Sequence, residues 1–143
     1  MRLIGPTLQT ERLILRPVEA QDFDAWAGFC ADAETMEFLG GVQPRAVAWR
    51  GFLSSAGAWV IQGFSMFSVV ERSSGAWVGR VGTIHPEGWP GTEVGWGIVR
   101  ERWGRGYAGE AAKAAMDWAV DHLGWSEIIH TSPDGRPPSP SPP

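Results

Sequence analysis

The sequence has very little cysteine and no long apolar run. Cys30 is the single cysteine among 143 residues, which excludes an internal disulfide and any metal site built from several cysteines. No segment has the apolar length that a membrane-spanning helix needs, and residues 1–13 lack the apolar centre of a signal peptide. Because free cysteine is typical of reducing compartments, these absences together predict a cytoplasmic protein.

An excess of positive charge is also lacking. The net charge of −4 argues against a general nucleic-acid binder and against a protein that binds anionic membranes. A composition of 43% hydrophobic and 20% charged residues is that of an ordinary globular domain, and 143 residues are enough to bury a core. We therefore expect one folded domain whose partners are neither nucleic acid nor membrane.

The spacing of apolar residues predicts an α+β fold, with a mostly antiparallel sheet and helices on its faces. Alternating or β-rich runs predict strands over 12–18, 64–72, 76–85, 92–99 and 127–131. Helical spacing predicts helices over 23–29, 44–58 and 106–123, with Gly57 ending the second. Ser73, Ser74 and Gly75 supply a hairpin turn between two of the strands. The last helix lies between two strands, so its crossover makes that pair parallel.

The helix over 106–123 has one apolar stripe and one charged face. The stripe consists of small or apolar residues at helical spacing: Ala108, Ala112, Ala115, Met116, Ala119 and Leu123. The residues on the opposite side are charged: Glu110, Lys113, Asp117 and Asp121. A stripe made mostly of alanine allows the helix to pack close to a sheet.

The start of this helix has the features of an anion site. Gly104 and Gly106 permit backbone conformations that other residues disfavour, and free amides at a helix start suit a phosphate or diphosphate. Arg102 and Arg105 add full positive charges. The alternative is that glycines before a helix are common and that surface arginines are merely solvated. The literal G-x-G-x-x-G over 104–109 is not a dinucleotide site, because the preceding strands are antiparallel and no acid follows a second strand.

The run EVGWGIVRERWGRGYAGEA (93–111) resembles the acetyl-CoA-binding motif of the GNAT superfamily of N-acetyltransferases. The chain looks most like the branch with the ribosomal-protein alanine and serine N-terminal acetyltransferases. TERLILRPVEAQDFDAW (10–26) resembles the first strand and helix of that branch, VGRVGTIHP (78–86) resembles its third strand, and the similarity extends over about residues 8–131. Glu101 is a departure, since the family motif has Gln or Arg at that position.

The resemblance implies acetyl-CoA as cosubstrate, no metal, and a parallel strand pair that splays apart around the pantetheine arm. The pantetheine is expected along 98–100 and the diphosphate on the amides of 102–108. The implied cofactor-binding residues are Ile98, Val99, Arg100, Arg102, Trp103, Gly104, Arg105, Gly106, Tyr107 and Ala108. In this family a neutral amine attacks the thioester directly, without a covalent intermediate with the enzyme.

The same resemblance assigns catalytic roles to two residues. Glu93 matches an acidic position that deprotonates the amine, usually through water; the alternative is a solvated residue at a strand start. The Val99 backbone amide, freed by the splay, is the expected donor to the thioester oxyanion. The histidines have no metal-ligand spacing and are not expected as the base: His85, His122 and His130. Cys30 is expected to be a buried apolar residue.

The end of the chain departs from the family pattern, which continues with one more helix and two strands. Six of the twelve residues 132–143 are proline, which disfavours helix and interior strand. We therefore expect an incomplete acetyltransferase domain over 1–131 and a disordered tail over 132–143, as in a truncated or frameshifted protein. The strand over 127–131 then becomes an edge through which a homodimer could form. Two main functions remain open: acetyl transfer to a primary amine, on a protein N-terminus or a small molecule, and an inactive CoA-binding or oligomerisation module. A third, a nucleotide-binding domain of another kind, predicts ATP or NAD binding that CoA does not displace.

Overall fold

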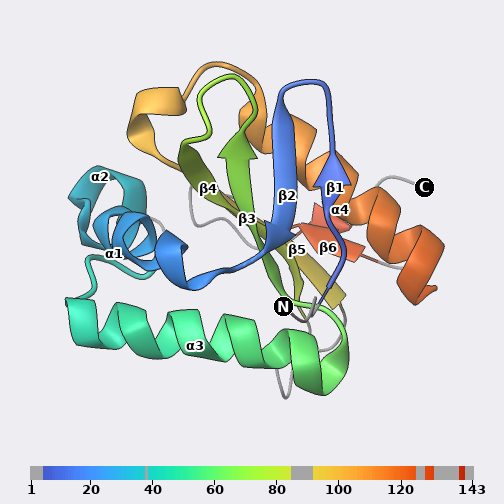
Figure 1. The fold of residues 1–143 in the computed structure, drawn as a ribbon, viewed down its shortest axis with the longest axis horizontal. Helices are drawn as coiled ribbons and strands as arrows, with labels where there is room; N and C mark the ends of the chain where they lie inside the picture. The colour runs from blue at the N-terminus through green and yellow to red at the C-terminus, as the bar shows by residue number, and fades with distance from the viewer. Residues whose placement is uncertain (1–4, 38, 85–91, 125–127, 131–138, 141–143) are drawn as a thin grey trace.

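The computed structural model describes residues 5–37, 39–84, 92–124, 128–130 and 139–140 (Figure 1). The helices are α1 (Phe23–Ala31), α2 (Ala33–Met36), α3 (Arg45–Gln62) and α4 (Tyr107–Leu123), with short 3-10 turns η1 (Ala20–Asp22) and η2 (Arg100–Arg102). The strands are β1 (Leu8–Gln9), β2 (Leu13–Pro17), β3 (Met66–Glu71), β4 (Trp77–Ile84), β5 (Thr92–Ile98), β6 (Ile128–His130) and β7 (Ser139–Pro140). Every strand and helix expected from the sequence is present.

The strands form one sheet in chain order, β1 to β7. Neighbours from β1 to β5 are antiparallel, and β5 and β6 are parallel because α4 crosses between them. In Figure 1, α1 and α2 lie to the left of the strands, α3 below them and α4 to the right. The predicted α+β fold, with a mostly antiparallel sheet and one parallel pair, is confirmed.

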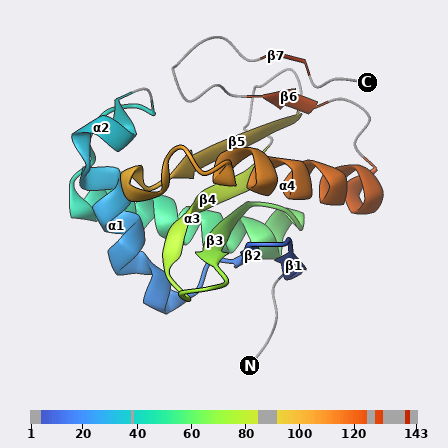
Figure 2. The ribbon, with the colours of Figure 1, turned by 90° about the horizontal axis from the view of Figure 1, so that it is seen from above.

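The edge of the sheet differs from the expectation in one respect. β7 pairs antiparallel with β6, His130 opposite Ser139 and Ile129 opposite Pro140, so β6 is not the outermost strand (Figure 2). The proline-rich segment thus contributes an edge strand at two residues, which is the position in a sheet that tolerates proline. The remainder of the expected tail lies outside the described residues.

The parallel pair is short. Its register runs over three residue pairs, from Thr92 opposite Ile128 to Val94 opposite His130. β5 continues along β4 as far as Ile98 opposite Gly79. Among the described residues, β5 therefore pairs with β6 only in its N-terminal half, and the segment after His130 that would show the predicted splay lies outside them.

The helix α3 extends beyond Gly57, where the sequence predicted that it ends. It continues through Gly57 and ends before Gly63, whose φ of +82° is a left-handed cap. A glycine inside a helix weakens it but does not end it. Phe52 and Trp59 are buried on either side of Gly57, so their packing holds the helix together across the glycine. The sequence analysis also did not anticipate the short elements β1 and α2.

One hydrophobic core lies between the sheet and α4. Leu13, Leu15, Phe67 and Val69 of β2 and β3 are buried there, and the α4 residues that join them are Tyr107, Ala111, Ala112, Ala115, Trp118 and Ala119. The buried stripe of α4 is therefore rotated around the helix relative to the predicted one. The reason is that the aromatic rings of Tyr107 and Trp118 are the largest apolar groups on α4 and occupy core positions. The predicted stripe residues Ala108, Met116 and Leu123 are only partly buried.

A second core lies against α1, α2 and α3. The rings of Phe23, Trp26 and Phe52 pack within 5.3 Å of one another in two pairs, Phe23–Phe52 and Trp26–Phe52. Cys30 is fully buried in this cluster, and burial raises the pKa of its thiol. The prediction that Cys30 is a packing residue is confirmed.

Asp22 is a buried carboxylate that joins β2, β3 and the start of α1. Its side chain is 3% exposed and accepts hydrogen bonds from Arg16 Nη1 at 2.8 Å, Ser68 Oγ at 2.8 Å and the Glu19 amide at 2.8 Å. Burial opposes ionisation, but these donors outweigh it and the pKa of Asp22 is lowered. The ionised carboxylate thus stabilises the fold above its unfolded pKa and loses this contribution as the pH falls through its folded pKa.

The substitution Asp22→Asn is expected to lower the free energy of unfolding by about 3 kcal/mol, because it removes the closer and more buried charge partner of Arg16 and leaves only Glu19 Oε1, at 3.6 Å. Urea denaturation measures the difference. Asp24→Asn is the matched control: Asp24 is 87% exposed and pairs with the exposed Arg45, so it is expected to cost less than about 0.5 kcal/mol. Equal losses in the two variants would contradict this description of the Asp22 network.

The substitution Gly57→Ala is expected to raise the free energy of unfolding by about 0.5–1 kcal/mol, since alanine has the higher helix propensity. A β-carbon at Gly57 would meet no atom within 4 Å, so no packing cost offsets the gain. Thermal unfolding measures the change. A lowered melting temperature would show that α3 is not continuous at this residue.

Candidate functional site

The turn between β5 and α4 has the backbone geometry that the two glycines predicted. Gly104 and Gly106 have φ of +80° and +79°, in the left-handed region that disfavours other residues. Gly106 is the N-cap of α4, and no side chain caps the helix. The first bond of the helix runs from the Glu110 amide to the Gly106 carbonyl. Among the described residues no acceptor contacts the N–H groups of 104–109, which leaves a row of amides at the positive end of α4.

This turn surrounds a small hollow of about 120 Å³. Seven of the ten predicted cofactor-binding residues line it: Ile98, Arg102, Trp103, Gly104, Gly106, Tyr107 and Ala108. The other three predicted residues, Val99, Arg100 and Arg105, lie in or beside the same turn without lining the hollow. The structure thus brings the predicted residues together at one place, where the C-terminal end of β5 meets the start of α4.

The arginines of the turn have different partners. Arg100 binds away from the hollow, with its Nε 3.2 Å from Asp32 Oδ2 and 3.8 Å from Glu34 Oε2. Arg102 Nε lies 3.1 Å from Glu71 Oε2, and its side chain is 25% exposed. The Arg105 side chain is 52% exposed, and its Nη1 lies 3.8 Å from the same Glu71 oxygen.

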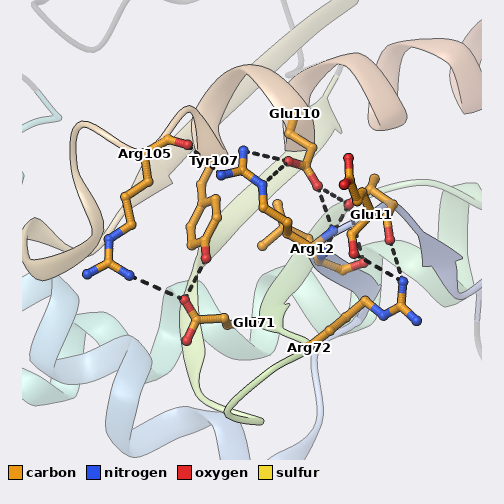
Figure 3. A network of polar contacts seen from close by, with 9 residues as sticks. Glu11, Arg12, Glu71, Arg72, Arg105, Tyr107 and Glu110 are labelled. Carbon is orange, nitrogen blue, oxygen red and sulfur yellow. Dashed lines mark hydrogen bonds and ion pairs between the residues drawn. The ribbon is translucent and has the colours of Figure 1, made fainter.

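Glu71, at the end of β3, is the acceptor that Arg102 and Arg105 share, and Figure 3 shows its contacts with Arg105 and Tyr107. Its side chain is 7% exposed and accepts hydrogen bonds from Ser74 Oγ at 2.6 Å, Tyr107 Oη at 2.6 Å and Arg102. These donors, the Ser74 hydroxyl first, lower the pKa of Glu71 to about 2. The same contact raises the pKa of Tyr107. Glu71 is therefore an anion throughout the physiological pH range, fixed beneath the turn.

Arg12, at the start of β2, supports the turn from the other side. Its Nη1 donates to the Arg105 carbonyl at 2.7 Å, and its Nη2 lies 2.7 Å from Glu110 Oε1 (Figure 3). Its guanidinium lies 4.7 Å from the centre of the Tyr107 ring. Glu110 also accepts a hydrogen bond from Thr10 Oγ1, and its side chain is only 18% exposed. Glu110 was predicted on the side of α4 opposite the apolar stripe; it is held instead against the segment between β1 and β2 by Arg12 and Thr10.

Two backbone groups differ from the expectation for a splayed strand. The Val99 N–H donates to the Val78 carbonyl at 2.8 Å, so it is not free to bind an oxyanion in this structure. The reason is that the β4–β5 ladder continues one residue past the pairing of Gly79 with Ile98. The Ile98 carbonyl accepts from Trp103 Nε1 at 2.7 Å.

The remaining predicted residues are placed only in part. Glu93 lies in β5 between Ile84 of β4 and Ile129 of β6, and its side chain lies outside the described part of the chain. His85 lies outside the described residues altogether, and His130 is in β6. The His122 ring stacks on Trp118 near the end of α4, away from the turn. No group of three or more His, Cys, Asp or Glu in the described ranges could hold a metal ion, and no helix there is long and apolar enough to span a membrane.

Glu71, Arg12 and the hydroxyl of Tyr107 could not be predicted from the sequence as parts of this site. Periodicity carries no signal for such contacts, because Tyr107 and Glu71 are 36 residues apart and Arg12 and Glu110 are 98 apart. One local signal was present. Glu71 ends a strand whose preceding residues, Phe67 to Val70, are all buried, and a carboxylate beside such a segment needs a partner.

Comparison with known proteins gives the family. The model of the acetyltransferase (GNAT) domain matches residues 12–134. The chain is 26% identical over 135 residues to the uncharacterized N-acetyltransferase p20 of Bacillus licheniformis, covering 92% of this chain and 76% of that protein. It is 34% identical to an acetyltransferase of known structure from Agrobacterium tumefaciens, with a TM-score of 0.82, covering 92% of this chain and 77% of the other.

More distant solved structures share the fold. One is the ribosomal-protein-S5-alanine acetyltransferase of Vibrio fischeri, with a TM-score of 0.71 at 17% identity, covering 88% of this chain and 73% of that one. Another is the spermidine N-acetyltransferase of Vibrio cholerae in complex with CoA and spermine, with a TM-score of 0.69 at 17% identity and coverage of 85% and 71%. The match of the family model over most of the chain, with the 34% identity and the shared fold, shows that this chain belongs to the GNAT family of N-acetyltransferases.

Proposed function

We propose that this chain transfers the acetyl group of acetyl-CoA to a primary amine, and that the β5–α4 turn binds the diphosphate of the cosubstrate. The observation that carries the proposal is the row of amides over 104–109, which have no acceptor among the described residues and open α4 at two left-handed glycines. A diphosphate supplies several acceptor oxygens and the negative charge that a helix start favours. Family membership supports acetyl-CoA as its source.

The positions of the pantetheine arm and the thioester follow from the position proposed for the diphosphate, to which they are covalently joined. The pantetheine arm would follow the backbone of 98–100 into the region where β5 extends beyond its register with β6. The thioester would then lie beside β5, the strand that carries Glu93. The ten residues from Ile98 to Ala108 predicted from the sequence, without Glu101, remain our proposed binding set.

The proposed reaction is direct attack. Glu93, through a water molecule, takes a proton from the ammonium group of the acceptor, and the neutral nitrogen then attacks the thioester carbon. The C–S bond breaks as the amide forms, the nitrogen loses its second proton, and the departing CoA thiolate takes up one proton to leave as the thiol. We do not assign the oxyanion to the Val99 amide, because Val78 already accepts its proton.

The acceptor is proposed as a primary amine, on a protein N-terminus or on a small molecule. The two more distant structures are named for amine acceptors of these two kinds, a ribosomal-protein alanine and spermidine. We place the reaction in the cytoplasm, which fits the single buried thiol of Cys30. A homodimer through the outer edge of the sheet would now involve β7 rather than β6.

The direct test is thiol release from acetyl-CoA with a panel of N-terminal peptides and small amines. Acetyltransfer predicts release that depends on the amine and saturates with acetyl-CoA. Binding of acetyl-CoA without release for any amine would instead support an inactive CoA-binding module, the second function that the sequence leaves open.

The substitution Gly106→Ala is expected to weaken CoA binding about tenfold, because a left-handed backbone costs an L-residue about 1–2 kcal/mol and the turn relaxes away from its amide geometry. Calorimetric titration measures the affinity. Gly124→Ala is the matched control, since Gly124 has a φ of +70° at the other end of α4 and no atom near its β-carbon position. This control should lose stability without losing affinity; a loss of affinity in both variants would mean that the effect is not local to the turn.

The substitution Glu93→Gln is expected to lower kcat at least about a hundredfold and to leave the KM for acetyl-CoA within about twofold, because it removes the base but no cosubstrate contact. Steady-state kinetics at several pH values measure both constants. Glu37→Gln, a charge change at an exposed residue of the α1–α3 side, serves as control. An unchanged kcat in Glu93→Gln would remove Glu93 from the mechanism.

A further inference from the structure

The turn holds three arginines, but the structure does not leave all three available to a ligand. Arg100 is bound to Asp32 and Glu34. Arg102 and Arg105 share one carboxylate, Glu71, and they share it unequally. A diphosphate binds more readily to an arginine whose existing ion pair is weak. The contacts of Arg102 and Arg105 with Glu71 therefore show which of the two is available.

Arg102 is bound firmly to Glu71. It donates through Nε to Oε2 at 3.1 Å and through Nη2 to Oε1 at 3.4 Å, a two-point contact that matches the planes of the two groups. Both side chains are largely buried, 25% and 7% exposed. Arg102 also lines the hollow, yet its guanidinium is directed at the carboxylate beneath it.

Arg105 is bound loosely to the same carboxylate. Its contact with Glu71 is an ion pair of 3.8 Å, longer than a hydrogen bond, and its side chain is half exposed. The Arg105 side chain also lies within hydrogen-bonding reach of the Tyr107 hydroxyl, a neutral partner. Its backbone is fixed, because Arg12 Nη1 donates to the Arg105 carbonyl at 2.7 Å. Figure 3 shows the Arg105 side chain extended toward Glu71 from the turn. A fixed backbone with a loosely held guanidinium is the arrangement expected of a group that changes partner.

We propose that Glu71 determines which arginine binds the ligand. It keeps Arg102 paired, where Arg102 supports the turn, and it leaves Arg105 available to bind the diphosphate. Glu71 is thus a positioning residue, since it acts on the ligand through the arginines. The inference rests on the proposed function, because it takes the diphosphate of CoA as the ligand of this turn. It narrows the binding set predicted from the sequence, in which Arg102 and Arg105 had equal roles.

The test compares dephospho-CoA, which carries the diphosphate and adenosine, with pantetheine, which lacks both; the charge of an arginine variant acts on the diphosphate and not on the uncharged adenosine. Arg105→Gln is expected to weaken dephospho-CoA binding about tenfold and to leave pantetheine binding within twofold, as measured by calorimetry. Arg102→Gln is expected to lower the melting temperature while the ratio of the two affinities stays within about threefold of the original. Arg102→Lys keeps a positive charge next to Glu71. It is used for the same comparison of the two affinities if Arg102→Gln does not fold.

The double variant Glu71→Gln/Arg105→Gln distinguishes selection of an arginine by Glu71 from a purely structural role of Glu71. Release of Arg102 from Glu71 lets it replace Arg105, so dephospho-CoA binding should recover at least threefold relative to Arg105→Gln alone. A purely structural role predicts further weakening. Glu37→Gln/Arg105→Gln, with the same charge change at a distant residue, should show no recovery.

Failure of the diphosphate site and failure of the selection by Glu71 give different results. If the unaltered protein binds dephospho-CoA no better than pantetheine, the turn does not take a diphosphate and the proposed function itself is wrong. If it prefers dephospho-CoA but the Arg102 variants lose that preference as strongly as Arg105→Gln, or the double variant does not recover, the selection by Glu71 is overturned while the diphosphate site stands.

Discussion

The carboxylate of Glu71 joins three segments that lie far apart in the chain. It belongs to β3, it accepts from Ser74 in the hairpin before β4, and it accepts from Arg102 and Tyr107 on either side of the glycine turn. Such a contact holds only if the carboxylate stays ionised, and the same donors that surround Glu71 lower its pKa to about 2. The position of the turn over the sheet therefore depends on one buried negative charge.

The sheet provides the frame for that charge. β4 and β5 pair without interruption from Ile84 opposite Glu93 to Gly79 opposite Ile98. A β-carbon at Gly79 would meet the Gly97 carbonyl at 2.3 Å, so glycine is what allows the two strands to approach so closely at this point. Because β5 leads directly into the turn, its register on β4 determines where the amides of 104–109 lie. The packing of α4 through small alanines then fixes the direction in which its positive end points.

Most of the fold could be predicted from the sequence because it rests on local patterns. The meander of β3, β4 and β5 and the helix α4 follow from apolar spacing and from turn residues that act within a few positions. The stop of α3 at Gly57 was wrong because the buried rings of Phe52 and Trp59 override the low helix propensity of a single glycine. The two glycines of the turn were predicted correctly, since their φ values follow from steric freedom alone.

The polar architecture of the site could be predicted only in part. The arginines were recognised as charges near a helix start, but their partners come from β3 and from the α1–α2 junction, and no local pattern records such pairings. The same holds for Glu110, which the periodicity of α4 places opposite the apolar stripe and which pairs with Arg12. The Val99 amide was expected to be free, yet whether it is free depends on how far the β4–β5 ladder extends.

Binding of the acetyl-CoA diphosphate by the glycine turn is the property on which the proposed function depends. Calorimetric titration of the purified 143-residue chain with acetyl-CoA, alone and in the presence of inorganic pyrophosphate, tests it most directly. The account predicts binding of one acetyl-CoA per chain that pyrophosphate weakens competitively. An absence of binding, or binding that pyrophosphate leaves unchanged, would contradict it.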